Sequence, residues 1–233
     1  MRSAALRHPP NSRARAAGAT PQGSKPLSPL LCARPRRRAR ACARRDATPD
    51  KAGGALVDVR RRSEGPYASF YAEIELDTTP GAGAAISLHE LTPLVKRAVA
   101  ESGVADGSVL VTAAHTTTAV VVNEHEPRLM DDVRQFLRRL APASDPWLHN
   151  DLHLRFAPDG WPGGDEAWRA QEPVNAQAHV QALLLGGSAT LAVVGGALKI
   201  GQWQSVIGVE LDGPRRRRWG VAVQGLVAPE EAR

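Results

Sequence analysis

The nine residues Ser69–Asp77, SFYAEIELD, set the pattern from which the fold can be read. Side chains at every second position of this stretch are apolar: Phe70, Ala72, Ile74 and Leu76. Such a period of two is typical of a strand that buries one face and leaves the other in water. The stretch therefore predicts a half-buried strand near the start of the folded domain.

Downstream of this strand, apolar residues recur at the spacing of a helix in two segments, and a third helix is expected further along the chain. Ser87 is a candidate N-cap, because Glu90 follows it at the spacing of a capping box. Glycine and proline then mark where the helices stop. The expected helices run from Ser87 to Gly103, from Pro127 to Pro142, and over residues 176–185 with Gly186 as the cap.

Valine-rich runs separated by turn residues predict the remaining strands. Gly195 and Gly196 form a turn suited to a hairpin. Strands outnumber helices and do not alternate with them as in a βαβ protein, so we expect an α+β fold with a mostly antiparallel sheet and about three helices. The later strands are expected at residues 109–113, 119–122, 190–194, 197–200, 204–211 and 219–226.

Charge is distributed unevenly along the chain. The sequence has 30 Lys and Arg against 24 Asp and Glu. Residues 1–45 hold 12 of the basic residues and none of the acidic ones, so the remainder carries 18 basic against 24 acidic residues, a net charge of −6. A basic segment without acids, rich in Ala, Arg, Ser and Pro, is typical of an organelle transit peptide. We expect residues 1–45 to direct the protein to the chloroplast or, alternatively, to the mitochondrion.

The rest of the chain is expected to contain one domain. Both cysteines, Cys32 and Cys42, lie in the targeting segment, so disulfides and cysteine-ligated zinc are excluded for the mature protein. No window approaches ~18 consecutive apolar residues, and we expect no membrane partner. The expected boundaries are a disordered linker over residues 46–66, a domain over 67–227 and a C-terminal tail over 228–233.

The sequence has no Gly-rich phosphate loop, dinucleotide fingerprint or nucleophile elbow. Polar residues gather instead at the ends of segments that otherwise look buried. Three of them are His115, His149 and His179, and three imidazoles can hold a divalent ion such as Zn²⁺ or Mg²⁺ with one coordination position open. The alternative for each is an ordinary histidine with a satisfied hydrogen bond. His89 and His125 are expected on the surface.

Several short motifs occur in one order between about Ser69 and Gln224. They are His115-Thr116-Thr117, Asn123-Glu124, Asp131-Asp132, His149-Asn150-Asp151, Ala178-His179, Gly201-Gln202-Trp203-Gln204 and Glu210-Leu211-Asp212-Gly213-Pro214-Arg215. In these motifs the chain resembles the YjbQ-like family of small, mostly uncharacterised proteins. The resemblance implies an α+β fold, a homotrimer, a polar site near the subunit boundary that includes the three histidines, and a weak, secondary thiamine-phosphate synthase activity. Two features depart from the family form: a longer segment between His149 and His179, and Val174 where a glycine often stands.

Thiamine-phosphate synthesis joins a pyrimidine carried on diphosphate to a thiazole phosphate, so its site must hold two anions and stabilise the departing charge. Glu124 and Asp132 are the candidate catalytic residues, because a carboxylate can orient a ligand histidine. Trp203 would stack on a heterocycle or else anchor the core. The candidate binding residues for a small phosphorylated or heterocyclic ligand are Thr116, Thr117, Asn123, Asn150, Trp203, Gln204 and Arg215.

Two other functions fit the same residues. One is metal-assisted hydrolysis of small phosphate esters, and the other is a trimeric protein that binds a small ligand without turning it over. Nucleic acid is not an expected partner. The basic run Arg215–Arg218 splits between two faces of a strand, and the expected domain is acidic overall.

Overall fold

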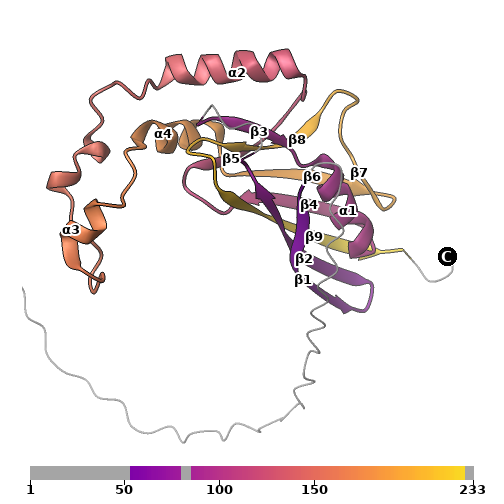
Figure 1. The fold of residues 1–233 in the computed structure, drawn as a ribbon. Helices are drawn as coiled ribbons and strands as arrows, with labels where there is room; N and C mark the ends of the chain where they lie inside the picture. Colours follow the sequence, from indigo (N-terminus) through magenta and orange to yellow (C-terminus); the bar gives the residue numbers. More distant parts are fainter. Residues whose placement is uncertain (1–52, 80–84, 229–233) are drawn as a thin grey trace, which may run out of the picture. The chain divides into compact units, whose positions relative to one another are not determined.

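Strands account for more of the chain that the structure describes than helices do (Figure 1). The structure is a computed structural model, and it describes residues 53–79 and 85–228. The expected targeting segment and nearly all of the expected tail lie outside the described residues. The strands are β1 (Ala55–Glu64), β2 (Tyr67–Asp77), β3 (Ser87–Glu90), β4 (Val104–Ala113), β5 (Thr118–Asn123), β6 (Ser188–Val194), β7 (Ala197–Leu198), β8 (Ser205–Glu210) and β9 (Arg216–Val227). The helices are α1 (Thr92–Ser102), α2 (Pro127–Leu140), α3 (Gly164–Arg169) and α4 (Ala176–Leu185), with short 3-10 turns η1 (Leu148–Asn150) and η2 (Leu152–Leu154).

The larger sheet has six antiparallel strands in the order β1-β2-β9-β4-β6-β7. Its second strand, β2, contains the alternating stretch, and every second residue there is buried. In the pairing of β2 with β9, Ile74 lies opposite Trp219, and both are fully buried. The prediction of a half-buried strand is therefore confirmed.

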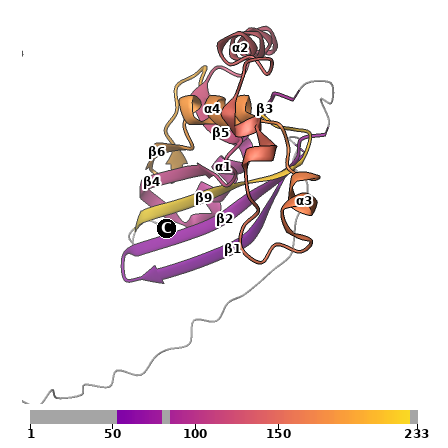
Figure 2. The same ribbon diagram turned by 90° about the vertical axis from the view of Figure 1, so that its left-hand side faces the viewer.

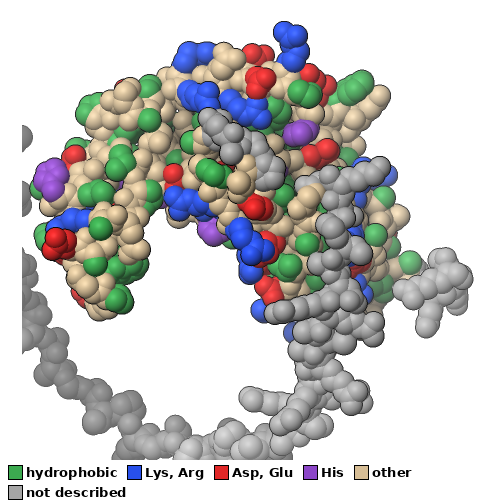
Figure 3. Space-filling model, in the orientation of Figure 1, with side chains coloured by type: hydrophobic (Ala, Val, Ile, Leu, Met, Phe, Trp, Pro, Cys, Tyr) green, Lys and Arg blue, Asp and Glu red, His purple; other side chains and the backbone are tan. Residues whose placement is uncertain are grey.

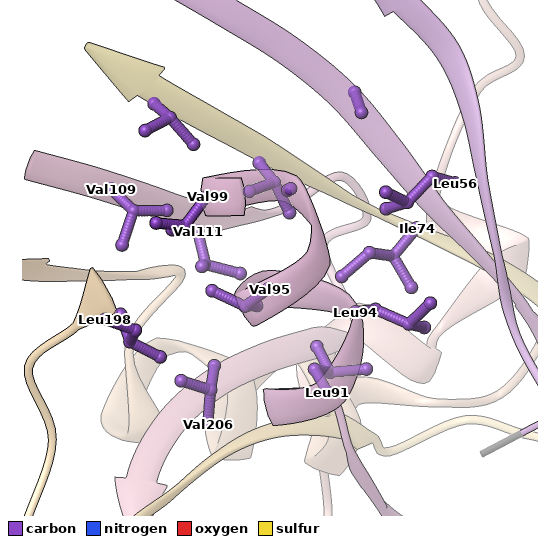
Figure 4. Packing of buried hydrophobic residues seen from close by; sticks show 14 of the residues in the cluster. Leu56, Ile74, Leu91, Leu94, Val95, Val99, Val109, Val111, Leu198 and Val206 are labelled. Carbon is purple, nitrogen blue, oxygen red and sulfur yellow. The ribbon is translucent and has the colours of Figure 1, made fainter. Parts of the chain in front are cut away.

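Helix α1 covers the inner face of this sheet. Figure 4 shows Leu94, Val95 and Val99 of α1 among the apolar side chains of the strands around them. Burial of such a side chain stabilises the fold by about 1.5–3 kcal/mol. The helix ends at Gly103, whose φ of 73° is the left-handed conformation that glycine adopts without strain. This is the end that the sequence predicts.

The smaller sheet has three antiparallel strands in the order β3-β8-β5. Val206 of β8 belongs to the core around α1. Ile207 and Val209 point to the opposite face of the sheet, where they pack with Met130 of α2 and Ala178 of α4 in a second core. Figures 1 and 2 both show α2 and α4 on this side. The α+β prediction with mostly antiparallel pairing is confirmed.

Two elements differ from the expectation. Ser87 is not an N-cap: it belongs to β3, where it pairs with Glu210, and α1 begins only at Thr92 with a proline in its first turn. Residues 55–64, assigned from the sequence to the linker, form the edge strand β1. Leu56 is the one buried residue of β1, so this strand has little of the alternating pattern by which strands are recognised.

No helix among residues 53–79 and 85–228 is long and apolar enough to cross a membrane.

Candidate functional site

Two of the three predicted histidines lie side by side. His149 comes from η1 and His179 from the second turn of α4, and their ring centroids are 4.8 Å apart in an edge-to-face arrangement, with an interplanar angle of 67°. Nε2 of His149 is buried and has no hydrogen-bond partner among the described residues. A buried ring nitrogen without a partner is costly unless a ligand or ion engages it.

Neighbouring side chains hold the backbone on both sides of this histidine pair. Nη1 of Arg155 donates to the carbonyl oxygen of His149 at 3.1 Å. Oδ1 of Asn150 accepts from the backbone N–H of Ala176 at 3.1 Å, which satisfies a free donor at the start of α4. The two histidines therefore stand on segments that are fixed to each other.

A second link ties α4 to the turn between β8 and β9. Nδ2 of Asn175 donates to Oδ2 of Asp212 at 2.8 Å, and Nη2 of Arg215 donates to the same oxygen at 2.8 Å. Asn175 is almost fully buried, and its Oδ1 has no partner among the described residues. This link places the half-exposed Arg215 guanidinium beside the first turn of α4.

The third predicted histidine, His115, stands in the loop between β4 and β5. The loop closes on itself, because the Thr118 hydroxyl and backbone N–H both donate to the carbonyl oxygen of His115, at 2.9 and 3.1 Å. Thr117 is buried beneath it and accepts from Nη2 of Arg217 at 2.9 Å. That guanidinium also forms a buried ion pair with Glu210. Thr117 is therefore already engaged within the protein.

The surroundings of His115 and His149 favour neutral imidazoles. Burial lowers the pKa of His149, and the nearby Arg155 and His179 lower it further. Burial also lowers the pKa of His115, with Arg217 adding to the effect and Glu210 opposing it. A neutral imidazole has a lone pair free for a metal ion. No group of three His, Cys, Asp or Glu residues that could hold a metal ion occurs among the described residues of one chain, so the pair would need a ligand from elsewhere.

The other predicted site residues lie mainly on the surface. Trp203 is 70% exposed, so it does not anchor the core, a role that the fully buried Trp219 fills. Gln204 turns its Oε1 back to the backbone N–H of Gly201 at 2.9 Å. Thr116, Asn123, Glu124 and Asp132 are exposed.

Two histidines differ from the surface positions expected for them. His89 is mostly buried in β3, where its Nε2 lies 2.8 Å from Oγ of Ser87. Nε2 of His125 is buried without a partner among the described residues. The mistaken helix over residues 87–103 explains the error for His89, since that helix would have turned its side chain away from the core.

The arginine run divides as its alternation predicts. Arg217 points inward to Glu210, whereas Arg216 and Arg218 point outward to Glu75. Arg218 also pairs with Glu73 at 2.8 Å, and its hydrogen bonds to Glu75 first and Glu73 second raise the pKa of its guanidinium. Each arginine of the run thus has a carboxylate partner, with Arg215 on Asp212.

Comparisons with known proteins agree with this fold and set of motifs. A family model described as UPF0047 protein YjbQ-like matches residues 73–226. A UPF0047 protein of Methanothermobacter thermautotrophicus is 35% identical over 140 residues, which is 60% of this chain and 84% of that protein. One from Archaeoglobus fulgidus is 35% identical over 133 residues, or 57% and 87% of the two chains.

Solved structures show the same likeness. A YbjQ-like protein of unknown function from Sulfolobus solfataricus superposes with a TM-score of 0.56 at 31% identity, covering 68% of this chain and 99% of that one. A hypothetical protein from Aeropyrum pernix gives 0.55 at 32% identity, covering 66% and 98%. Fold and site together define an α+β protein with a paired-histidine polar site. The chain belongs to the YjbQ-like UPF0047 family.

Proposed function

We propose that His149 and His179 hold a divalent metal ion, with His115 as the third ligand, and that the protein acts there on a small phosphorylated or heterocyclic ligand. The activity we propose is weak, secondary thiamine-phosphate synthesis. The observation that carries this proposal is the adjacent histidine pair with one buried, unpartnered ring nitrogen. Imidazole ligands suit Zn²⁺ better than Mg²⁺, so zinc is the first ion to test.

The residues around the pair suit an anionic ligand. When bound, the ion would supply a positive charge that stabilises a departing diphosphate. The half-exposed guanidinium of Arg215, oriented by Asp212, would bind a phosphate. Asn150 would act by fixing the start of α4 next to His149 rather than by touching the ligand.

We further propose that the third ligand comes from another copy of the chain, in a homotrimer. Exposed apolar residues lie next to both members of the histidine pair: Leu148 is 84% exposed, and Leu183, one turn beyond His179, is 82% exposed. Exposed apolar side chains gathered in one place mark association surfaces. A second copy seated there would approach the pair and could bring its own His115 to it.

Elemental analysis of the purified protein tests the metal proposal. We expect about one zinc per chain, and loss of most of it in His149→Ala and His179→Ala, because each ligand also orients the others. His153→Ala is the control, since His153 is an exposed residue in the same part of the chain. Metal content that is absent, or equal in all these variants, would contradict the proposal.

The activity is tested separately on the metal-loaded protein. Incubation with the pyrimidine diphosphate and the thiazole phosphate should release diphosphate and form thiamine phosphate. Hydrolysis of a panel of phosphate esters in place of this reaction would identify a metal-assisted hydrolase. Ligand binding without turnover in either assay would identify a binding protein and overturn the proposed synthase activity.

We propose the chloroplast as the location, with the mitochondrion as the alternative, on the composition of residues 1–45. A fluorescent protein carrying this segment at its N-terminus should enter the organelle and lose the segment. Fluorescence that stays in the cytosol would contradict the proposal.

A further inference from the structure

Residues 152–172, which lie between His149 and His179 in the chain and which we call the arm, are braced by two arginines. The first of these is Arg169. Its Nε donates to the carbonyl oxygen of Leu152 at 2.9 Å, and its Nη2 donates to that of Arg155 at 2.7 Å. Nη2 also pairs with Asp165 at 3.3 Å. The guanidinium thus holds the two ends of the arm's irregular backbone together.

The second bracing residue is Arg155. It pairs with Glu172 at 3.0 Å and lies over the ring of Trp168, 4.9 Å from the centroid. Trp168 is itself buried, so the Arg155 guanidinium rests on a ring that is held in place. Arg155 also donates to the carbonyl oxygen of His149, which couples the arm to the histidine pair. The arm is therefore a built element rather than a loose loop.

The arm nevertheless turns large apolar side chains outward. Leu154 is 66% exposed and Phe156 is 76% exposed. Apolar side chains appear along this part of the chain in Figure 3, and in Figure 1 α3 lies away from the two sheets. Leu148, Leu183 and Leu184 are further exposed apolar residues, close in the chain to the two histidines.

The size of this surface fits a protein interface. Full burial of a Leu or Phe side chain removes on the order of 100 Å² of apolar surface from water, so these five partly exposed side chains together offer roughly 350 Å². A standard interface takes about 800 Å² from each partner, somewhat more than half of it apolar. The five side chains would supply most of the apolar part of such an interface.

We propose that the arm is a docking element for a second copy of this chain, with Leu154 and Phe156 as its contact residues. The inference rests on the self-association proposed above and adds to it the part of the chain that makes the contact. A second copy is the occupant that also accounts for the incomplete histidine site, because the arm is bonded to His149 itself. Docking of the arm would then hold His149 in place at the junction of the two copies.

The test substitutes both contact residues in the full-length chain. Leu154→Glu/Phe156→Glu should weaken self-association by about 100-fold or more, because charges would be buried where apolar anchors dock. Light scattering over a dilution series measures this change. Ala170→Glu/Gln171→Glu is the matched control, since it adds the same charge to exposed positions of the same arm. Phe156→Ser is a milder variant that keeps the test valid if the double variant misfolds.

Three results would overturn the proposal. If Leu154→Glu/Phe156→Glu assembles as well as the wild type and the control variant, the chain self-associates but the arm does not make the contact. If the wild type is a monomer at every concentration, the proposed self-association and the proposed role of the arm are both wrong. If hydrogen exchange at residues 152–157 is the same at concentrations where light scattering finds monomers and where it finds assemblies, a second copy does not dock on the arm.

Discussion

Burial of His89 against Ser87 makes the stability of the protein depend on pH. Burial is the main cause that lowers the pKa of His89, and His125 and Arg134 act in the same direction against Glu210. The pKa of a histidine in an unfolded chain is about 6.5. Just below this pH the unfolded chain therefore binds more protons than the folded chain. The contribution of neutral His89 to the free energy of unfolding is complete above about pH 6.5 and is lost as the pH falls towards the pKa of the folded state.

Because the pKa of His89 is lower in the folded chain, we predict that His89→Gln makes the free energy of unfolding less dependent on pH below about 6.5. Glutamine has no titrating group and can still hydrogen-bond to Ser87. Urea unfolding at several pH values measures the slope. His153→Gln, at an exposed position, should keep the wild-type slope. Equal slopes for His89→Gln and the wild type would show that burial of this ring does not matter.

The ion pair of Glu210 and Arg217 predicts a second result at the scale of residues. Arg217→Met leaves Glu210 charged and buried without its partner, which should cost about 3–5 kcal/mol of stability. Glu210→Met/Arg217→Met removes both charges and should cost less than the single change. Denaturant unfolding of the single and double variants decides the point. A double variant that is less stable than Arg217→Met would contradict it.

The placement of polar residues at element ends, together with the family motifs, identified two residues that the fold brings together, His149 and His179. It did not identify the residues that hold them. Asn175 and Asp212 are polar residues near element ends, like many others, and only the pairing of α4 with the β8–β9 turn shows that they bond. The sequence also did not predict that Arg217 pairs with Glu210. Alternation along a strand shows which face a residue lies on but not which residue it contacts on another strand.

At the scale of elements, the pairing of β4 with β9 depends on a glycine that leaves no room for a side chain. A Cβ on Gly107 would lie 2.1 Å from the backbone oxygen of Gln224 and 2.7 Å from Cα of Gly225. Backbone cannot move aside as a flexible side chain does. We therefore predict that Gly107→Ala destabilises the protein by about 1–3 kcal/mol or more.

Gly187→Ala is the matched control for this change. It lies just before β6, and a Cβ there would meet nothing within 4 Å. Thermal unfolding should show a clear loss for Gly107→Ala and little change for Gly187→Ala. Similar melting temperatures for the two variants would mean that the close approach of β4 and β9 is not needed.

Elements with a strong period were predicted well, and those without one were not. The stretch Ser69–Asp77 and the helix that starts at Pro127 carry clear periods, and both form as expected. β1 is an edge strand with mostly exposed residues, so its sequence shows no apolar alternation. At Ser87 a local capping pattern competed with pairing to β8, and the long-range pairing prevailed.

At the scale of the whole molecule, we predict a trimer at micromolar protein concentration. The number of subunits is what the family resemblance implies, and the exposed apolar residues near the histidine pair, such as Leu148 and Leu183, support association. Light scattering on the purified protein gives the mass directly. A monomer across the whole concentration range would contradict the prediction.

The central claim is that one site takes His115 from one copy and His149 with His179 from another, and mixing two defective chains tests it most directly. His115→Ala and His149→Ala should each bind little zinc alone. Co-expressed at equal amounts and mixed at random in closed rings, they should recover zinc in about a quarter of the sites, because some junctions then join an intact His115 to an intact pair. Zinc content in the mixture no higher than in either variant alone would contradict the claim.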